Sequence, residues 1–410
     1  MSPPVPADQP SAVILKMVAD RYAHGRLAAA RTLGRMGVPV VATAESRWNP
    51  EVLSRFVKRT VVLPMSQSPG DAELSLLLDL AGELADRPVL LATDDMSTLF
   101  VEDHAEVLAT RFRFPGQPAG LARSLADKGQ LYEMCLRTGT PTPSVSFPKS
   151  RDEAAGFAVA TTYPVVVKSM DPQVMRTRPA ATSVLIAEDE ASLLAAYDLM
   201  EDPARPNLMF QEYIPGDPQS VWMFDGYFDA GSRCLVGFTG QKLRQHPPTT
   251  GATSLGICTL NPAVHALACE FLGGIGYRGI VDMGFRYDGR DGQYKLLDVN
   301  PRMGATFRLF VGEAGTDVVE AMYRDMTGLP VREDRGVEGR RWVVEPSDIW
   351  TYGLEKKAGQ LTTREWLRSL RGVDERAWVA RDDPLPPAGV AALMALQTTR
   401  RRLRRTSSPT

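Results

Sequence analysis

The stretch Tyr294-Lys295-Leu296-Leu297-Asp298-Val299-Asn300-Pro301-Arg302 is the most informative part of the chain. A short apolar run delivers Asp298 and Asn300 two positions apart, so in an extended strand both side chains project from one face. Oxygen ligands at that spacing suit Mg²⁺, which prefers carboxylates and phosphate oxygens. Arg302 adds a fixed fork of N–H donors for a phosphate or carboxylate. Taken alone, these residues also fit a buried strand that runs into an ordinary Asn-Pro turn.

The composition is typical of a globular protein. Of the 410 residues, 44% are hydrophobic and 23% are charged, which predicts two or three domains with sizeable cores. The formal net charge of −2 argues against a general nucleic-acid binder. No apolar run approaches the ~20 residues of a membrane-spanning helix, and no signal peptide is visible at the N-terminus. We therefore expect a cytoplasmic protein.

The four cysteines are scattered along the chain. They are Cys135, Cys234, Cys258 and Cys269, and no two of them form a C-x-x-C pair. The sequence therefore suggests neither a zinc site nor a disulfide framework, and a reducing compartment fits this pattern.

The first 115 residues have the pattern of an open parallel α/β sheet. Apolar strands alternate with helical segments, with strands expected at residues 11–18, 38–42, 60–63 and 89–92 and helices at 25–36 and 72–85. The first loop, residues 19–25, is not a G-x-G-x-x-G turn, so a nicotinamide-dependent oxidoreductase built on this sheet would lack its phosphate-binding turn.

The pattern breaks near residues 114–118, where we place a domain boundary. The expected domains are residues 1–115, 116–330 (two lobes, split near 190–210) and an appendage at 331–398, followed by a basic, disordered tail at 399–410. In the second region we expect helices at 121–138, 191–202 and 262–275, buried strands at 163–168 and 208–214, and a hairpin at 278–300.

Two lysines lie at positions from which they could reach into a binding cleft. Lys168 ends a run of three valines, so its stem can pack below while its ammonium lies over a cleft; an edge lysine reaching solvent is the alternative. Lys128 lies in the predicted helix, where a solvated lysine is the simpler interpretation.

Further polar groups lie near predicted strand ends. Glu212 and Tyr213 end a strand whose free backbone N–H and C=O groups can read an adenine edge, while Glu212 accepts from an amino group. Lys242 and Arg244 place two cations on one strand face, fit for phosphate or a carboxylate. Asp94 and Asp95 follow a predicted strand and could hold an amine, although helix capping is the safer interpretation.

Six motifs occur in a fixed order: His24–Val40, Thr93-Asp94-Asp95, Asp127-Lys128, Val165-Val166-Val167-Lys168, Gln211–Gly216 and Asp298–Arg302. With these motifs the chain resembles the ATP-grasp superfamily, in its carboxylate–amine ligase-like branch, over residues 11–330. The resemblance implies an α/β and α+β fold, with a pre-ATP-grasp open parallel sheet domain, a two-lobed ATP-grasp fold and a small C-terminal appendage.

The resemblance also implies roles for single residues. Lys128 and Lys168 would contact ATP phosphates, and the segment Gln211-Glu212-Tyr213-Ile214 would hold the adenine. Asp298 and Asn300 would bind Mg²⁺, or Mn²⁺ in its place. Three cations would steady the phosphate or acyl phosphate, namely Arg302, Arg244 and Lys242.

Three departures from the family pattern stand out. Asp298 replaces the usual Glu. Gly284 stands before Phe285, where an acidic metal ligand is usual, so we nominate Asp282, two residues away on the same strand face. The loop at residues 169–178 lacks the usual glycines, and Arg176 or Arg178 would have to serve instead.

The sequence thus predicts an ATP-dependent ligase that joins a small-molecule or peptide carboxylate to an amine. A nucleotide-binding regulator or scaffold without ligase activity is the alternative. No nucleic-acid partner is expected, and a homo-oligomer is left open. Five arginines after a short apolar segment suggest weak contact with a membrane surface, at about 1 kcal/mol per basic residue; a solvated tail is the simpler interpretation.

Overall fold

The computed structural model describes residues 9–20, 23–64, 66, 68–84, 86–170, 184–202, 204–248, 251–332 and 334–406. The chain forms two compact units. Unit 1 comprises residues 1–122, 223–282 and 300–410, and unit 2 comprises residues 123–222 and 283–299. The domain boundaries expected from the sequence, at residues 115, 330 and 398, stay predictions.

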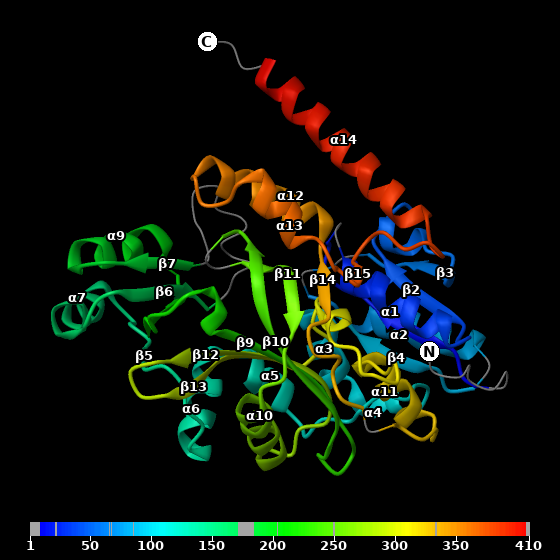
Figure 1. Cartoon of the computed structure of the whole chain (residues 1–410). Coiled ribbons are helices and arrows are strands. Elements are labelled where there is room, and N and C mark those ends of the chain that lie inside the picture. Colours follow the sequence, from blue (N-terminus) through cyan, green and yellow to red (C-terminus); the bar gives the residue numbers. More distant parts are fainter. Residues whose placement is uncertain are drawn as a thin grey trace. The chain divides into compact units, whose positions relative to one another are not determined.

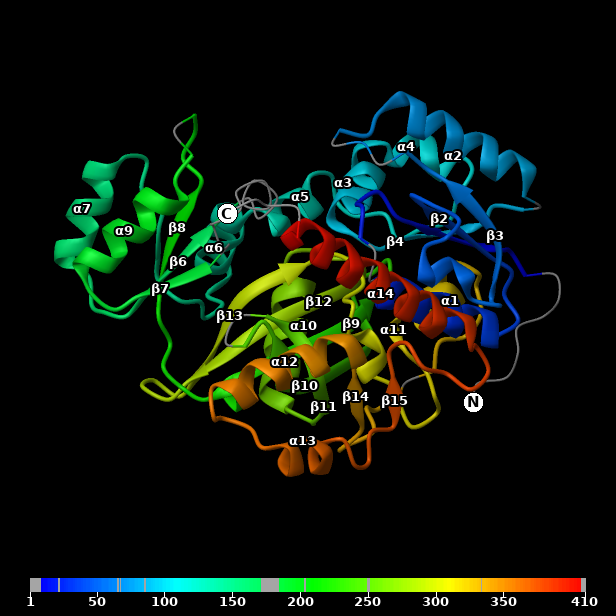
Figure 2. The ribbon, with the colours of Figure 1, turned by 90° about the horizontal axis from the view of Figure 1, so that it is seen from above.

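Unit 1 begins with the predicted parallel sheet, which is confirmed. Its strands are β1 (Ala12–Leu15), β2 (Val40–Ala44), β3 (Val57–Val62) and β4 (Val89–Ala92), in the order β3-β2-β1-β4. Helix α1 (His24–Arg35) covers one face; α2 (Asp71–Glu83), α3 (Asp95–Asp103) and α4 (Ala105–Ala109) cover the other (Figure 2).

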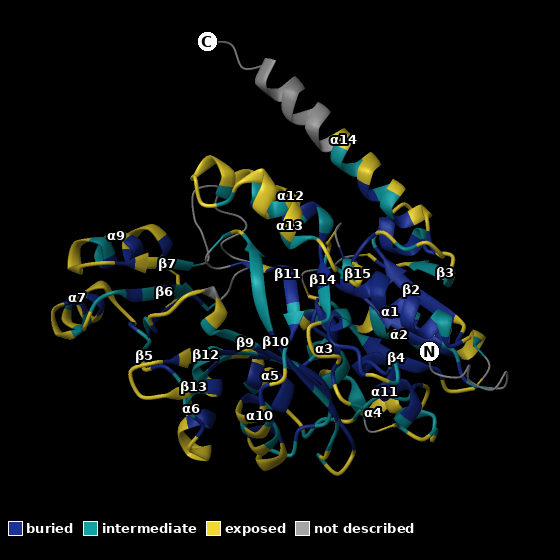
Figure 3. Ribbon diagram, viewed as in Figure 1, coloured by how far each residue is buried: buried dark blue, intermediate teal, exposed yellow. Residues whose placement is uncertain are grey.

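The two faces of this sheet follow directly from side-chain alternation. Ala12 and Ile14 of β1 join a core with Leu27 of α1, whereas Val13 and Leu15 join a core with α2 and α3. Every residue of β1 and of β2 is buried, as expected of strands covered by helices on both faces; Figure 3 shows this for β2.

Unit 1 also contains most of a seven-stranded sheet with the order β13-β12-β9-β10-β11-β14-β15 (Figure 1). Its strands are β9 (Val221–Phe228), β10 (Cys234–His246), β11 (Ala252–Cys258), β12 (Gly279–Asp288), β13 (Gln293–Asn300), β14 (Arg341–Val343) and β15 (Glu375–Arg376). The helices of this part are α10 (Pro262–Gly274), α11 (Val318–Met326), α12 (Glu345–Lys357) and α13 (Thr363–Ser369), with a 3-10 turn at Phe307–Leu309. Two further 3-10 turns lie at Pro50–Leu53 in unit 1 and at Pro218–Ser220 in unit 2. The predicted β12–β13 hairpin is confirmed.

Unit 2 is built on a four-stranded antiparallel sheet of order β5-β8-β6-β7. The strands are β5 (Val145–Ser146), β6 (Val165–Ser169), β7 (Val184–Ala187) and β8 (Leu208–Glu212); the helices are α6 (Lys128–Thr138), α7 (Arg151–Ala160) and α9 (Glu190–Met200). Apolar residues of α7 and α9 pack on Val165, Val167 and Phe210 of the sheet.

The helix predicted over residues 121–138 is two helices, α5 (Leu121–Ala126) and α6. Asp127 lies between them in an extended conformation and accepts a hydrogen bond from the Gln130 N–H at 2.8 Å. This cap satisfies a free N–H at the start of α6, so the helix restarts at Lys128.

The C-terminal helix α14 (Leu385–Thr406) continues through the five arginines, where the sequence led us to expect the start of a disordered tail at 399–410. Arginine favours helix almost as strongly as alanine and leucine, so the basic segment extends the helix. Side chains from residue 397 onward, and residues 407–410, lie outside the described part. Among the described residues, no helix is long and apolar enough to cross a membrane.

Candidate functional site

Lys168 and Gln211 come together in unit 2, on one face of the β6–β8 pair. The Lys168 ammonium donates to Gln211 Oε1 at 2.8 Å. The pairing of Val166 with Gln211 makes the two residues diagonal neighbours on that face. Burial lowers the pKa of Lys168 to about 8, although nearby Asp298 raises it; Lys128 lowers it further. The ammonium therefore does not extend into solvent as an edge lysine would.

Asp298 occupies the space that Gly284 leaves open. A Cβ on Gly284 would lie 2.2 Å from Asp298 Oδ1, so no larger residue fits there with Asp298 as it stands. The departure at position 284 is thus matched to the position of the Asp298 carboxylate. The family pattern has acidic residues at both positions, 284 and 298. Here the Asp298 carboxylate occupies the space beside Gly284, so this part of the hairpin carries one carboxylate.

Glu212 is engaged in an ion pair that the sequence did not reveal. Its carboxylate lies 2.5 Å from Arg290 Nη2 and accepts from the Ser144 N–H at 3.2 Å. Arg290 also pairs with Asp288 at 2.6 Å, and Lys295 pairs with Asp288 at 2.7 Å. The Arg290 hydrogen bond, joined by Lys295, lowers the pKa of Asp288.

The remaining predicted nucleotide residues of unit 2 lie at element ends. Tyr213 and Ile214 follow β8, and Ile214 is buried. Lys128 is the first residue of α6. The proposed substitutes Arg176 and Arg178 lie outside the described residues.

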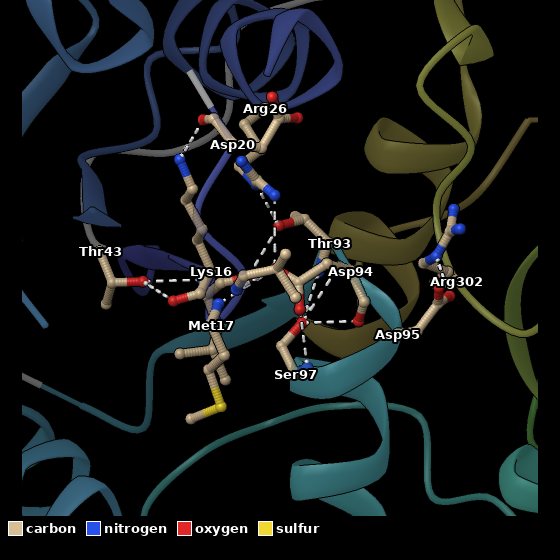
Figure 4. Close-up of polar contacts among 12 residues, drawn as sticks. Lys16, Met17, Asp20, Arg26, Thr43, Thr93, Asp94, Asp95, Ser97 and Arg302 are labelled. Carbon is tan, nitrogen blue, oxygen red and sulfur yellow. Dashed lines mark hydrogen bonds and ion pairs between the residues drawn. The ribbon is translucent and has the colours of Figure 1, made fainter. Parts of the chain in front are cut away.

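In unit 1, three of the predicted residues form a hydrogen-bonded chain. Asn300 Nδ2 donates to Asp282 Oδ2 at 3.3 Å, and Arg302 Nη2 donates to Asn300 Oδ1 at 3.3 Å. Arg302 Nε also donates to Asp95 Oδ1 at 2.5 Å (Figure 4). A Cβ on Gly304 would lie 2.8 Å from Asp282 Cγ, so this glycine makes room for the carboxylate.

Asp94 caps helix α3 at the carboxyl ends of β1 and β4, as the safer interpretation predicted. Its side chain accepts from the Ser97 N–H at 2.8 Å, from the Met17 N–H at 3.0 Å and from Arg26 Nη2 at 3.3 Å (Figure 4). The Arg26 Nη1 atom beside this network is buried and has no hydrogen-bond partner in the structure. No sequence pattern singled out Arg26.

The expectation that Lys242 and Arg244 share a strand face is wrong. Lys242 pairs with Gly256 and Arg244 pairs with the adjacent Leu255, so a bulge interrupts the alternation between them. Arg244 is held by the buried Asp348, at 2.8 Å and 3.0 Å from its two carboxylate oxygens. Lys242 instead donates to the Gly251 carbonyl at 3.1 Å.

Asp225 on β9 is a second group that sequence analysis missed. Its carboxylate is fully buried, and neither of its oxygens has a hydrogen-bond partner in the structure. Burial raises the pKa of Asp225, and neighbouring Asp282 and Asp317 raise it further. Carboxylates in such surroundings favour a proton or a cation.

Comparison with known proteins supports the fold. No protein-family model matches the chain. It is 22% identical over 273 residues to D-aspartate ligase of Enterococcus faecium (strain Aus0004). The aligned region covers 64% of this chain and 65% of that ligase. The chain therefore matches just under two thirds of the length of this curated relative.

Two solved structures have the same fold. The biotin carboxylase domain of Hydrogenobacter thermophilus 2-oxoglutarate carboxylase, solved with MgADP, ADP and bicarbonate, is 18% identical, with a TM-score of 0.57, and covers 81% of this chain and 73% of that one. The N5-carboxyaminoimidazole synthetase of Staphylococcus aureus is 13% identical, with a TM-score of 0.60 and 83% coverage of both chains.

Proposed function

Because the chain has the ATP-grasp fold, as its sequence motifs predicted, we propose that it is an ATP-dependent carboxylate–amine ligase. The observation that carries this proposal is the environment of Lys168. Its partly buried ammonium donates to a neutral amide at 2.8 Å, and burial and Asp298 both affect its pKa. A desolvated cation of this kind favours a ligand that brings negative charge, such as a triphosphate.

The proposed reaction has two steps. An oxygen of the substrate carboxylate attacks the γ-phosphorus of ATP, the bond to the bridging β–γ oxygen breaks, and ADP leaves. The amine nitrogen then attacks the carbonyl carbon of the acyl phosphate; phosphate leaves, and the nitrogen loses a proton to give the amide. Charge neutralisation and positioning supply most of the catalysis in such phosphoryl transfers, so no protein nucleophile is required.

The residues present fit a divalent cation. Asp298 and Asn300 lie two positions apart in β13, and Asp282 accepts from Asn300 at 3.3 Å. These hard oxygen donors suit Mg²⁺ or Mn²⁺ better than softer metals. When bound, the ion would neutralise phosphate charge, and this chain's part would be to hold Asp282, Asp298 and Asn300 in place.

Arg26 and Arg302 support a carboxylate as the substrate. Both belong to unit 1: Arg26 has a buried, unpartnered Nη1, and Arg302 is held by Asp95. A guanidinium with a free donor suits a planar anion. The similarity to D-aspartate ligase makes D-aspartate and related small amino acids the first substrates to test.

The direct test measures ADP and phosphate release from ATP with panels of carboxylates and amines. We expect Lys168→Met and Asp298→Asn to lower turnover by about 100-fold or more, the usual cost of losing one charge-stabilising group. Lys149→Met, which removes another lysine of unit 2 whose residue is exposed, is the matched control and should retain turnover. If both site variants turned over substrate like the parent, the ligase proposal would fail.

A nucleotide titration separates the ligase from the regulator alternative. A non-hydrolysable ATP analogue should bind more tightly with Mg²⁺ than without it. Nucleotide binding that is indifferent to Mg²⁺, with no turnover on any substrate pair, would favour a regulator.

Contact of the basic helix with anionic lipid stays a secondary proposal. Its support is the continuation of α14 through five arginines. Liposome sedimentation should show weaker partition for a chain ending at residue 396. Equal partition of the two forms would remove the idea.

A further inference from the structure

Cys234, His265 and Cys269 gather at one point of unit 1, although Cys234 is distant in sequence from the other two. One potential ligand atom from each side chain lies within 4.8 Å of the others. His265 and Cys269 stand four residues apart on α10, so both side chains leave one face of the helix. Cys234 begins β10, against which α10 packs. The cysteine spacing suggested no zinc site, and the proximity of these three side chains comes from the fold.

The separation of Cys269 and His265 is close to that of two ligands in a tetrahedral metal site. Cys269 Sγ lies 3.7 Å from His265 Nδ1 and 4.0 Å from Nε2. Zinc–sulfur bonds of about 2.3 Å and zinc–nitrogen bonds of about 2.0 Å, at tetrahedral angles, place sulfur and nitrogen ligands about 3.6 Å apart.

A glycine keeps the space between the ligands open. A Cβ on Gly237 would lie 2.8 Å from His265 Nε2 and 2.9 Å from Cys234 Sγ. These two ligand atoms thus converge over the backbone of β10 from different elements. Phe224 packs against His265, with ring centroids 5.7 Å apart in an edge-on arrangement, and limits the directions the imidazole can take.

We propose that Cys234, His265 and Cys269 bind a Zn²⁺ ion that clamps the start of β10 to α10. Two thiolates and an imidazole form a soft donor set that selects zinc over Mg²⁺. Among the described residues, no further His, Cys, Asp or Glu joins the group, so water would take the fourth position. Binding releases the two thiol protons. The site shares no residue with the proposed nucleotide site, so either proposal can fail without the other.

The test uses the full-length chain, reduced with a phosphine and stripped of metal, and titrated with Co²⁺ as a spectroscopic probe and then with Zn²⁺. We expect one equivalent of Co²⁺ to give a thiolate-to-cobalt charge-transfer band that Zn²⁺ displaces, and Zn²⁺ to raise the melting temperature. Cys234→Ser and Cys269→Ser should each lose about half of the band and bind at least about 10-fold more weakly.

Two matched pairs of variants keep the result unambiguous. Cys258→Ser removes a buried cysteine outside the cluster and should leave the band unchanged. Gly237→Ala fills the space between the ligands and should weaken binding, whereas Gly274→Ala, where a Cβ meets nothing within 4 Å, should not. Absence of the band in folded, reduced protein would overturn the proposal, as would equal loss in Cys258→Ser. The proposal would also be overturned if Cys234 and Cys269 formed a disulfide in air and the reduced protein showed no measurable Zn²⁺ binding.

Discussion

The two ends of the proposed nucleotide site in unit 2 satisfy their charges differently. At the phosphate end, Lys168 contacts the neutral Gln211 amide at 2.8 Å, and no carboxylate of the described residues lies within ion-pair distance of it. At the adenine end, Glu212 is already paired with Arg290 at 2.5 Å, and Arg290 is shared with Asp288.

This difference determines which existing contacts a ligand must replace when it binds at each end. A partly buried cation without a contacting counter-ion is costly, and an arriving phosphate relieves that cost. A carboxylate already in an ion pair can accept a new hydrogen bond only by sharing or exchanging its partner. The Arg290 and Glu212 side chains are 46% and 29% exposed, so the exchange is made in water and costs little. The phosphate end therefore favours an arriving anion. At the adenine end, the weak Arg290–Glu212 ion pair must first open or be shared.

Among the variants that compare the two ends, the largest expected effect comes from Gly284→Ala at the phosphate end. The added Cβ would lie 2.2 Å from Asp298 Oδ1 and would displace that carboxylate. We expect the Mg²⁺ concentration for half-maximal turnover to rise by about 10-fold, the scale seen when a group that orients a metal ligand is changed. A steady-state Mg²⁺ titration with saturating ATP measures this shift.

Gly289→Ala is the control for that experiment. Gly289 lies in the same hairpin, and a Cβ there would meet nothing within 4 Å. Its Mg²⁺ dependence should equal that of the parent. If the two alanine variants behaved alike, Asp298 would not be the group that binds the metal.

The second prediction uses pH to separate the two ends. Burial lowers the pKa of Lys168 to about 8, so its ammonium is mostly charged at pH 7 and mostly neutral at pH 9. We expect ATP-analogue affinity to fall about 10-fold over this range, following the charged fraction of one group. Bound phosphate favours the charged form, so above pH 8 binding should take up a proton. Calorimetry in two buffers of different ionisation enthalpy measures the uptake, and Lys168→Met should abolish it.

The same group predicts the opposite slope for stability. Because the pKa of Lys168 in the folded chain lies below its ordinary value of 10.5, the unfolded chain binds more protons between about pH 8 and 10.5. The free energy of unfolding gains a positive contribution as pH rises through this window. Denaturant titrations at pH 8 and pH 10 should show this contribution in the parent and not in Lys168→Met. A parent that matched the variant at both pH values would place the pKa near its ordinary value.

Local patterns predicted the parts of the site that depend on one strand or one turn. Lys168 ends an apolar run and Asp298 follows one, so side-chain alternation and strand length were enough to place them. The N-cap at Asp94 is likewise a local hydrogen-bond pattern and was foreseen. The parallel sheet of unit 1 followed from continuous apolar strands separated by helical segments.

The parts that sequence could not predict depend on long-range pairing or on irregular backbone. Arg302 meets Asp95 across 207 residues, and Arg290 meets Glu212 across 78, and no local pattern encodes either pair. The bulge between Lys242 and Arg244 breaks the alternation on which a shared strand face was inferred. The Cys234–His265–Cys269 cluster needed the packing of α10 on β10, which spacing along the chain does not reveal.

The smallest expected effect comes from Arg290→Ala, which removes the Arg290–Glu212 ion pair. Without Arg290, the Glu212 carboxylate is free to accept from the adenine amino group. Since exposed ion pairs contribute at most about 1 kcal/mol, nucleotide affinity should rise by no more than about fivefold. Arg151→Ala is the control, because it removes another exposed arginine–aspartate pair of unit 2, with Asp198. ADP titrations without Mg²⁺ isolate this end from the metal. Weaker binding by Arg290→Ala than by Arg151→Ala would mean that Arg290 contacts the nucleotide directly. In that case the Arg290–Glu212 ion pair would not oppose nucleotide binding, and the proposed difference between the two ends would not hold.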